Sequence, residues 1–136
     1  MKNKLIIIFT FLFMINLSLT SGAIYVVGEV SDAEDGTSAN GHTVMIWNPK
    51  YGTVDNVTDI IGKEGNSQTE NIYLIDCEDL KNICQVGDVI QVRVLNNGDG
   101  YISITEKVNI NNFMNIASTL KLIKKRTTFL CSFFRC

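Results

Sequence analysis

The segment from Asp32 to His42, DAEDGTSANGH, holds the residue types that could most readily bind a ligand or carry out catalysis. Three carboxylates stand within four residues, at Asp32, Glu34 and Asp35, and His42 is the only histidine of the chain. Grouped carboxylates can bind Ca²⁺, but an EF-hand loop needs alternating oxygen ligands and a glutamate at position twelve, which here is Thr43. We therefore expect a solvated turn between two strands, with a looser Ca²⁺ site at the three carboxylates as the alternative.

The histidine by itself does not predict a hydrolase. A nucleophile–His–acid arrangement needs a serine or cysteine on a rigid turn and a third group that orients the imidazole. The chain lacks a G-x-S-x-G motif, and His42 opens an expected strand, where we place it at the surface. The 14 acidic residues offer many carboxylate pairs for glycoside hydrolysis, yet no feature singles one out. We expect no enzyme, and we assign no catalytic residue, metal or cofactor.

Two further features could serve recognition at the surface. Trp47, Tyr51 and Tyr73 could form an exposed aromatic face for carbohydrate, but tryptophan and tyrosine on strands more often pack in the core or at its rim. We favour packing, with Trp47 covering the second face of its sheet, and keep Trp47 beside the acidic segment as a candidate ligand residue. Asn56 begins the tripeptide Asn-Val-Thr, an acceptor for N-glycosylation in a secreted protein.

The four cysteines fall into two pairs of different spacing. Cys77 and Cys84 lie in CEDLKNIC, and Cys131 and Cys136 lie in CSFFRC, so neither pair is the C-x-x-C of redox motifs or zinc sites. No second histidine completes a zinc set. A bridge between Cys77 and Cys84 would close a loop of about eight residues and stabilise the fold by roughly 2.5 kcal/mol. We favour this disulfide over two buried free thiols.

The elements that must position these residues follow from a hydrophobic repeat of period two. Apolar residues alternate in AIYVVGEV, HTVMIWN, NIYLID, DVIQVRVL and YISITEKVNI, which predicts half-buried strands. The segment TVDNVTDIIG predicts a weaker edge strand, with Asp55 and Asp59 guarding against unwanted pairing. Turn signals such as NNGDG separate the strands, and only CEDLKN looks helical. The pattern predicts an all-β fold, an antiparallel sandwich of about six or seven strands.

The first 23 residues have the composition of a targeting signal. Lys2 and Lys4 precede the apolar run LIIIFTFLFMINLSL, and Ser21 and Ala23 supply the small residues expected before a cleavage point. We expect residues 1–23 to be a signal helix that is removed on export, which places the protein outside the cell or on its surface and permits disulfides. The alternative is an uncleaved anchor helix, although the strictly apolar part is shorter than the ~20 residues that a span requires.

Residues 113–136 depart from the alternating pattern of residues 24–112. Phe113, Ile116, Ala117 and Leu120 recur at helical spacing, and the segment KLIKKRTTFLCSFFRC that follows is basic and aromatic. We interpret residues 113–136 as a basic tail outside the domain. It is either helical on a membrane surface, disordered, or an end produced by truncation or a frame shift.

Charge is distributed unevenly between these two regions. Residues 24–112 carry 14 acidic and 5 basic side chains, a formal charge of −9, whereas residues 113–136 carry five basic side chains and no acidic one. An acidic domain repels nucleic acid, because phosphate binding needs a basic face. We therefore expect no nucleic-acid partner, and membrane contact only through the signal or anchor segment or through the basic tail.

The stretches IYVVGEV, DGTSANGHTVMIWNPKYG, IGKEGNS, IYLID, GDVIQVRV and GYISITEKVNI follow one another over residues 24–112. Their order resembles that of carboxypeptidase regulatory-like domains, which are transthyretin-like, immunoglobulin-type β-sandwiches found as modules of prokaryotic, notably archaeal, surface proteins. The chain departs from that pattern at Ser38, where proline is commoner, at His42, where a small residue is commoner, and in the insert from Cys77 to Cys84.

The resemblance implies a non-catalytic structural or adhesion module, with no catalytic residues to carry over. Its partners would be other surface proteins or surface glycans, bound through the loops of residues 32–42 and 61–71. The residues themselves leave two alternatives. One is a Ca²⁺- or carbohydrate-binding surface module, and the other is a membrane-associated protein that uses its basic C-terminal tail.

Overall fold

The computed structural model describes residues 22–125 and shows an essentially all-β fold in that range. The signal segment expected at residues 1–23 therefore lies almost entirely outside the described residues, as does the tail beyond residue 125. No helix in the described range has the length and apolarity needed to cross a bilayer. The elements are β1 Tyr25–Ser31, β2 Thr43–Trp47, β3 Asn56–Ile60, β4 Ile72–Asp76, the 3-10 turn η1 Cys77–Asp79, β5 Val89–Val94, β6 Tyr101–Ile102, β7 Glu106–Asn109, β8 Met114–Ile116, β9 Leu120–Lys121 and β10 Ile123–Lys124.

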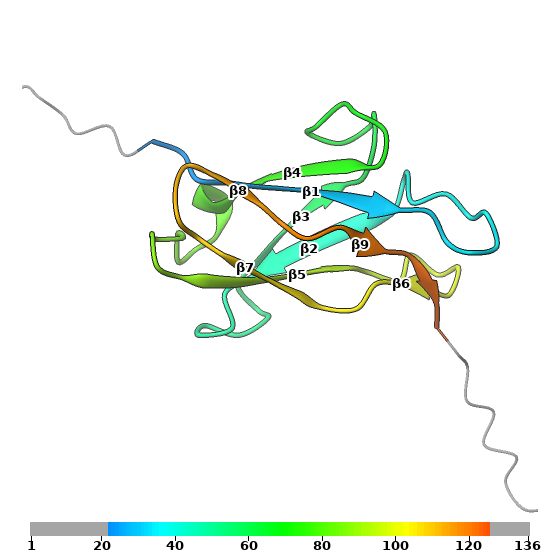
Figure 1. The fold of residues 1–136 in the computed structure, drawn as a ribbon. Coiled ribbons are helices and arrows are strands. Elements are labelled where there is room, and N and C mark those ends of the chain that lie inside the picture. The colour runs from blue at the N-terminus through cyan, green and yellow to red at the C-terminus, as the bar shows by residue number, and fades with distance from the viewer. Residues whose placement is uncertain (1–21, 126–136) are drawn as a thin grey trace, which may run out of the picture.

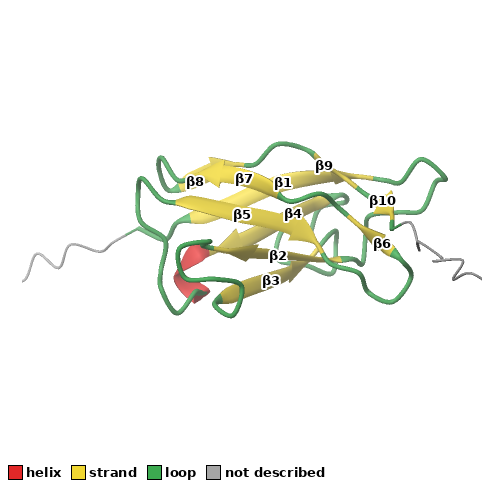
Figure 2. Ribbon diagram, turned by 90° about the horizontal axis from the view of Figure 1, so that it is seen from below, coloured by secondary structure: helices red, strands yellow, loops and turns green. Residues whose placement is uncertain are grey.

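Two larger sheets and one short ribbon are formed by these strands (Figure 1, Figure 2). One sheet has the order β3-β2-β5-β7 and is antiparallel throughout. In the other sheet β1 lies between β4, which runs antiparallel to it, and β8 and β9, which run parallel to it. β10 pairs antiparallel with β6 in the ribbon. The expected antiparallel arrangement is met except at β8 and β9.

The two sheets enclose one hydrophobic core. Alternation along each strand decides which side chains enter it, as with Val26 and Val30 of β1 and Ile90 and Val92 of β5, all fully buried. These are the side chains that the period-two pattern places on one face of each strand. The core also receives Val44, Ile46, Tyr73, Ile75, Val94, Val108, Ile110, Leu120 and Leu122.

β1 contains a glycine at a position that faces this core. Gly28 lies between the buried Val26 and Val30 and is paired with Tyr73 of β4. A Cβ at Gly28 would approach Cζ of Tyr73 to 2.6 Å and Cε1 to 2.8 Å, so the aromatic ring occupies the space that a side chain would fill. Aromatic cover of a strand glycine helps to fix the register of the two strands.

Residues 114–124 form β8, β9 and β10, so the domain boundary expected at 112 and the helix considered for the tail are wrong in this range. Asn115 and Ala117 are buried, and so are Leu120 and Leu122, which is an alternating pattern interrupted once. The interruption is the step of three residues from Ala117 to Leu120. Buried residues three apart are also typical of a helix, so this step resembles helical spacing. Strand geometry prevails because β8 and β9 pair with β1 and direct alternate side chains into the core.

β3 is an edge strand, as expected, but Asp59 is not the exposed charge that was expected to guard this edge against unwanted pairing. Asp59 is buried, and its carboxylate accepts hydrogen bonds from the backbone N–H groups of Ile60 at 2.8 Å, Asn66 at 3.0 Å and Leu74 at 2.9 Å. Such donors are what a buried carboxylate requires. Because Leu74 belongs to β4, this one side chain ties the edge of one sheet to the edge of the other.

Candidate functional site

The loop of residues 32–42, called the acidic loop below, connects β1 to β2 and contains the three carboxylates considered as Ca²⁺ ligands. Asp32 is exposed, but its carboxylate has two hydrogen-bond partners in the protein. Its Oδ1 accepts a hydrogen bond from Ala39 N at 2.8 Å and another from Asn71 Nδ2 at 3.3 Å. Asp32 therefore closes the acidic loop on itself and joins it to the residue that precedes β4.

The other two carboxylates of the acidic loop bind side chains of later strands. Glu34 Oε1 lies 2.7 Å from Lys121 Nζ of β9, and this contact lowers the pKa of Glu34. Asp35 accepts hydrogen bonds from the hydroxyl of Tyr101 and from Thr37 N, which lower the pKa of Asp35. The three carboxylates thus have separate partners. Among residues 22–125 no group of three or more His, Cys, Asp or Glu side chains is placed to hold a metal ion.

His42 is buried, with 6% of its surface exposed, so the surface position predicted from the sequence is wrong. Its Nε2 and Asp99 Oδ2 are hydrogen-bonded at 2.6 Å, and Asp99 Oδ1 accepts from Tyr101 N at 2.9 Å. The ring of Tyr101 stands edge-on to the imidazole, with 6.5 Å between the centroids. The hydrogen bonds from Tyr101 N and then from His42 lower the pKa of Asp99. We call His42, Asp99, Tyr101 and Asp35 the histidine cluster.

The histidine cluster contains two of the three parts of a hydrolytic triad. Asp99 orients the imidazole through Nε2, so a nucleophile would have to contact Nδ1. His42 Nδ1 is buried and has no hydrogen-bond partner among the described residues. No hydroxyl or thiol in residues 22–125 therefore hydrogen-bonds to the second ring nitrogen of this histidine. The histidine cluster joins the loop of residues 95–100 to the acidic loop.

Sequence reasoning missed Asp99 and Tyr101 as members of this site. The NNGDG motif predicts a tight turn, and a turn aspartate gives no sign that it will bind a histidine 57 positions away. One signal was present in the chain. A histidine that opens a strand needs a polar partner if it becomes buried, and a carboxylate in a turn at the same end of the sheet is the natural candidate.

The second loop expected to carry function, residues 61–71, lies against the acidic loop. Asn40 Nδ2 donates to Asn71 Oδ1 at 2.7 Å, and Asn71 N donates to Asn40 Oδ1 at 2.8 Å. Gly41 N donates to Ile61 O at 2.9 Å. Together with the loop of residues 95–100, the two loops form one polar end of the molecule; in Figure 1 the acidic loop and residues 95–100 lie on the right, and residues 61–71 form the loop above β4.

An open hollow of about 350 Å³ lies between the acidic loop and β10. Glu34, Asp35 and Tyr101 contribute to its lining, and Lys124 Nζ lies 5.7 Å from the centroid of the Tyr101 ring. Both carboxylates of this lining are already bonded to other side chains. The hollow therefore offers no free set of oxygen ligands for a cation.

The aromatic residues considered for sugar binding do not share a surface. Trp47 is only 5% exposed and lies outside the core cluster, on the other face of β2, with the Arg93 guanidinium 5.3 Å from its ring centroid. Tyr73 is fully buried in the core. Tyr51 is exposed, with the Lys50 ammonium group 5.1 Å from its ring centroid. Trp47 and Tyr73 are thus packed, as favoured from the sequence, and no common platform is formed.

The expected glycosylation site, Asn56, is the first residue of β3 and is exposed. Its Nδ2 donates a hydrogen bond to Thr53 O at 2.8 Å in the loop that precedes the strand. The amide therefore lies at the surface, where a modifying enzyme could reach it. Glycosylation at Asn56 stays a prediction.

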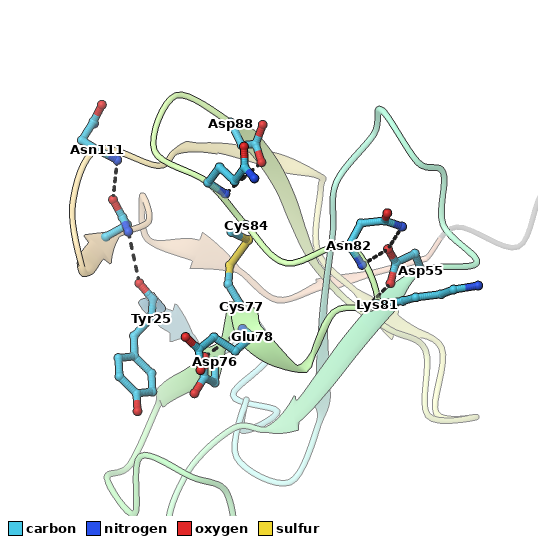
Figure 3. Close-up of a disulfide and its surroundings, with 12 residues drawn as sticks. Tyr25, Asp55, Asp76, Cys77, Glu78, Lys81, Asn82, Cys84, Asp88 and Asn111 are labelled. Atoms are coloured by element: carbon cyan, nitrogen blue, oxygen red, sulfur yellow. Dashed lines mark hydrogen bonds between the residues drawn. A yellow bond between two sulfur atoms is a disulfide. The ribbon is translucent and has the colours of Figure 1, made fainter. Parts of the chain in front are cut away.

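Cys77 and Cys84 form a disulfide (Figure 3). It begins in η1, which lies at the end of the sheets opposite the acidic loop (Figure 1). The two cysteine Cα atoms are 5.4 Å apart, and both side chains are buried in the core. The expected helical segment at residues 77–82 is only the single 3-10 turn η1. The other two cysteines, Cys131 and Cys136, lie outside the described residues.

The loop that the disulfide closes is held by Asp55 (Figure 3). One carboxylate oxygen accepts from Lys81 N at 2.8 Å, and the other accepts from Asn82 N at 2.9 Å and Asn82 Nδ2 at 2.8 Å. The side-chain bond from Asn82 and the backbone bonds lower the pKa of Asp55. Its role is therefore to anchor this loop, and the edge-guarding role expected for it is wrong.

Comparison with known proteins adds no relative to these observations. The chain matches no family model, no curated protein and no solved structure. The resemblance to carboxypeptidase regulatory-like domains rests on the sequence motifs alone.

Proposed function

We propose that this protein is a secreted or cell-surface, non-catalytic structural or adhesion module built on a transthyretin-like, immunoglobulin-type β-sandwich. The observation that carries the proposal is the state of the acidic loop. It contains four side chains that could bind a ligand or take part in catalysis. All four already have a hydrogen-bond or ion-pair partner within the protein; they are Asp32, Glu34, Asp35 and His42. Groups engaged in this way hold loops in place, which suits a scaffold better than a catalyst.

Two features support export. The buried disulfide between Cys77 and Cys84 is typical of proteins that mature in an oxidising compartment. The composition of residues 1–23 is that of a signal segment. A formal charge of −9 over residues 24–112 also suits a soluble extracellular module.

The polar end is the surface where a partner would bind. The acidic loop, residues 61–71 and residues 95–100 are joined by hydrogen bonds, so they are presented together in one preformed arrangement. Little ordering is required of such a surface when it binds, which favours affinity. Other surface proteins or surface glycans are the partners that a displayed loop surface would contact.

The two alternatives lose support in this arrangement. A Ca²⁺ site in the acidic loop would require Glu34 and Asp35 to leave Lys121 and Tyr101. A membrane-binding tail loses basic groups to the fold, because Lys121 pairs with Glu34 and Lys124 lies over the Tyr101 ring.

Surface labelling combined with thiol trapping tests the proposal. In an exporting host, the full chain should react with a membrane-impermeant biotin reagent on intact cells or be recovered from the medium. Cys77 and Cys84 should resist alkylation until a reductant is added. A variant that lacks residues 1–23 is the matched cytosolic control. Recovery of the full chain only in the cytosol, with both thiols alkylated, would contradict export.

Thermal melting with and without Ca²⁺ tests the non-catalytic scaffold against the strongest binding alternative. We expect no rise in melting temperature on addition of Ca²⁺, because the carboxylates are already engaged. A rise that the variant Asp35→Asn abolishes would replace the present proposal with a Ca²⁺-binding module.

A further inference from the structure

The first strand of the described fold, β1, lies beside two of the last three strands, β8 and β9, and runs in the same direction as they do. β1 is therefore joined, over nearly its whole length, to segments from the opposite end of the described chain. In the register of this pairing, residues 25–27 lie opposite residues 114–116, and residues 30–31 lie opposite residues 120–121.

The described chain enters and leaves at opposite ends of the sheets. Gly22 precedes β1 at the end that carries the disulfide, and Lys125 follows β10 at the polar end (Figure 1, Figure 2). In a parallel pair, a pull applied to the start of one strand and the end of the other acts along the strands. Tension on the chain would therefore slide β1 against β8 and β9 and would not lift it away.

Backbone hydrogen bonds that resist such sliding occur at both ends of β1 and in its middle. They are supplied by residues inside and just beyond the paired strands. Besides the ladder bonds within the paired strands, they include Tyr25 N to Phe113 O at 2.7 Å, Ala117 N to Val27 O at 2.9 Å, and Leu122 N to Ser31 O at 3.1 Å.

Two polar side chains reinforce the same junction. Asn115 is buried in β8, and its Nδ2 donates to Tyr25 O at 3.4 Å while its Oδ1 accepts from Asn111 N at 2.8 Å. Near the other end of β1, the hydroxyl of Ser31 donates to Leu120 O at 3.3 Å. Side-chain hydrogen bonds thus connect the paired strands at the two ends of the junction, where tension would be applied.

The core beneath the junction opposes sliding as well. Val26 and Val30 of β1 are fully buried, as is Leu120 of β9. A slip of one residue would turn the apolar side chains of β1 to the opposite face of the sheet. Sliding therefore removes core contacts at the same time as it breaks hydrogen bonds.

From these contacts we infer that the module bears tension along its chain axis, with the parallel pairing of β1 to β8 and β9 as the load-bearing junction. This role deepens the structural function proposed above and rests on it. When the strands are sheared, all bonds of the junction carry the load together. When the strands are peeled from one end, the bonds carry it one after another, so a smaller force separates them.

Single-molecule force spectroscopy in two pulling directions tests the inference on one and the same folded chain. The full chain, purified without export so that residues 1–23 stay attached, carries an azide-bearing residue at position 23 together with a second at either position 125 or position 111, and handles are attached through these groups. Positions 23 and 125 load the junction in shear. Positions 23 and 111 lie at the same end of β1 and β8 and peel the same two strands apart. The shear force should exceed the peel force by at least about twofold, since several hydrogen bonds must break together.

A pair of variants separates the junction from general stability. Asn115→Ala weakens the junction, whereas Val92→Ala creates a cavity in β5 of the other sheet. At equal loss of melting temperature, Asn115→Ala should lower the shear force more than Val92→Ala does. If Asn115→Ala fails to fold, the milder Ser31→Ala takes its place.

Equal forces in the two pulling directions would overturn the inference, and so would equal effects of the two variants. Neither result would alter where the protein is found or the state of its thiols. Failure of the load-bearing role is thereby distinguished from failure of the proposed surface module, which the labelling experiment measures.

Discussion

Among single residues, Tyr73 and Gly28 show how packing can outweigh a polar cost. The Tyr73 ring fills the space above Gly28, and its hydroxyl is buried with no hydrogen-bond partner in the described part of the chain. Burial raises the pKa of Tyr73 above its ordinary value of 10.0, because ionisation in the core is unfavourable. The ring is retained for its fit over a strand glycine.

Replacing the phenol tests this account. Tyr73→Phe should raise the free energy of unfolding by about 1 kcal/mol, because the ring contacts stay and an unpaired hydroxyl is removed. Urea denaturation at neutral pH measures the change. Gly28→Ala is the companion variant and should lower the same free energy by about 1–3 kcal/mol through overlap with the ring. A Tyr73→Phe variant less stable than the wild type would contradict the account.

The raised pKa of Tyr73 also gives a direction for alkaline pH. The folded state favours the neutral phenol of Tyr73. The contribution of this neutral phenol to the free energy of unfolding is therefore fully present below the ordinary pKa of 10.0. It is lost as the pH rises above that value and the unfolded chain ionises first. Above pH 10 the wild type should therefore lose stability more steeply than Tyr73→Phe.

At the scale of elements, strands of two to seven residues are too short to be held by pairing alone. Buried or capping polar groups join them at their ends. Asp59 ties β3 to β4, Asp55 holds the loop after η1, and Asn115 joins β8 to β1. The disulfide performs the same function by a covalent bond directly after β4.

Removal of the disulfide tests how much that covalent link contributes. The double variant Cys77→Ala and Cys84→Ala should lower the free energy of unfolding by about 2.5 kcal/mol, because the unfolded chain regains the freedom of a closed loop. Urea titration of the wild type with a reductant should reproduce most of this loss. A midpoint that neither treatment shifts would show that the bridge does not restrict the unfolded chain.

Over the whole molecule, the two ends of the sheets are stabilised by carboxylates that must stay charged. Asp35 and Asp99 hold the polar end together, and Asp55 holds the disulfide end. The pKa of each lies below the ordinary value of 3.8, chiefly because hydrogen-bond donors stabilise the anion. Both ends should therefore loosen in acid.

Acid melting tests this expectation. A lowered pKa in the folded state means that the contribution to stability is fully present above the ordinary value of 3.8 and is lost as the pH falls through the folded values. The melting temperature should change little from neutral pH down to about 4 and fall steeply below it. Asp35→Asn and Asp99→Asn should each be less stable at neutral pH and show a shallower fall. An unchanged melting temperature at about pH 2 would contradict this account.

Much of the fold could be predicted from local pattern. Alternation of apolar residues identified an all-β chain and placed Val26, Val30 and Ile90 on core-facing sides, because side-chain direction in a strand depends only on position along it. The spacing of Cys77 and Cys84 likewise indicated their disulfide, because a short loop brings its two ends close together. These properties need no knowledge of which strands become neighbours.

Only the tertiary structure decided which strands and side chains meet. The parallel pairing of β8 and β9 with β1, the burial of His42 against Asp99, and the bond from Leu74 to Asp59 all join residues far apart in the chain. A period of two specifies the face that a side chain occupies but not the partner across from it. Partners are set when both sheets close over one core and every buried polar group must find a donor or acceptor at once. The acidic loop therefore binds the rest of the protein through Lys121, Tyr101 and Asp99, which lie outside its own eleven residues.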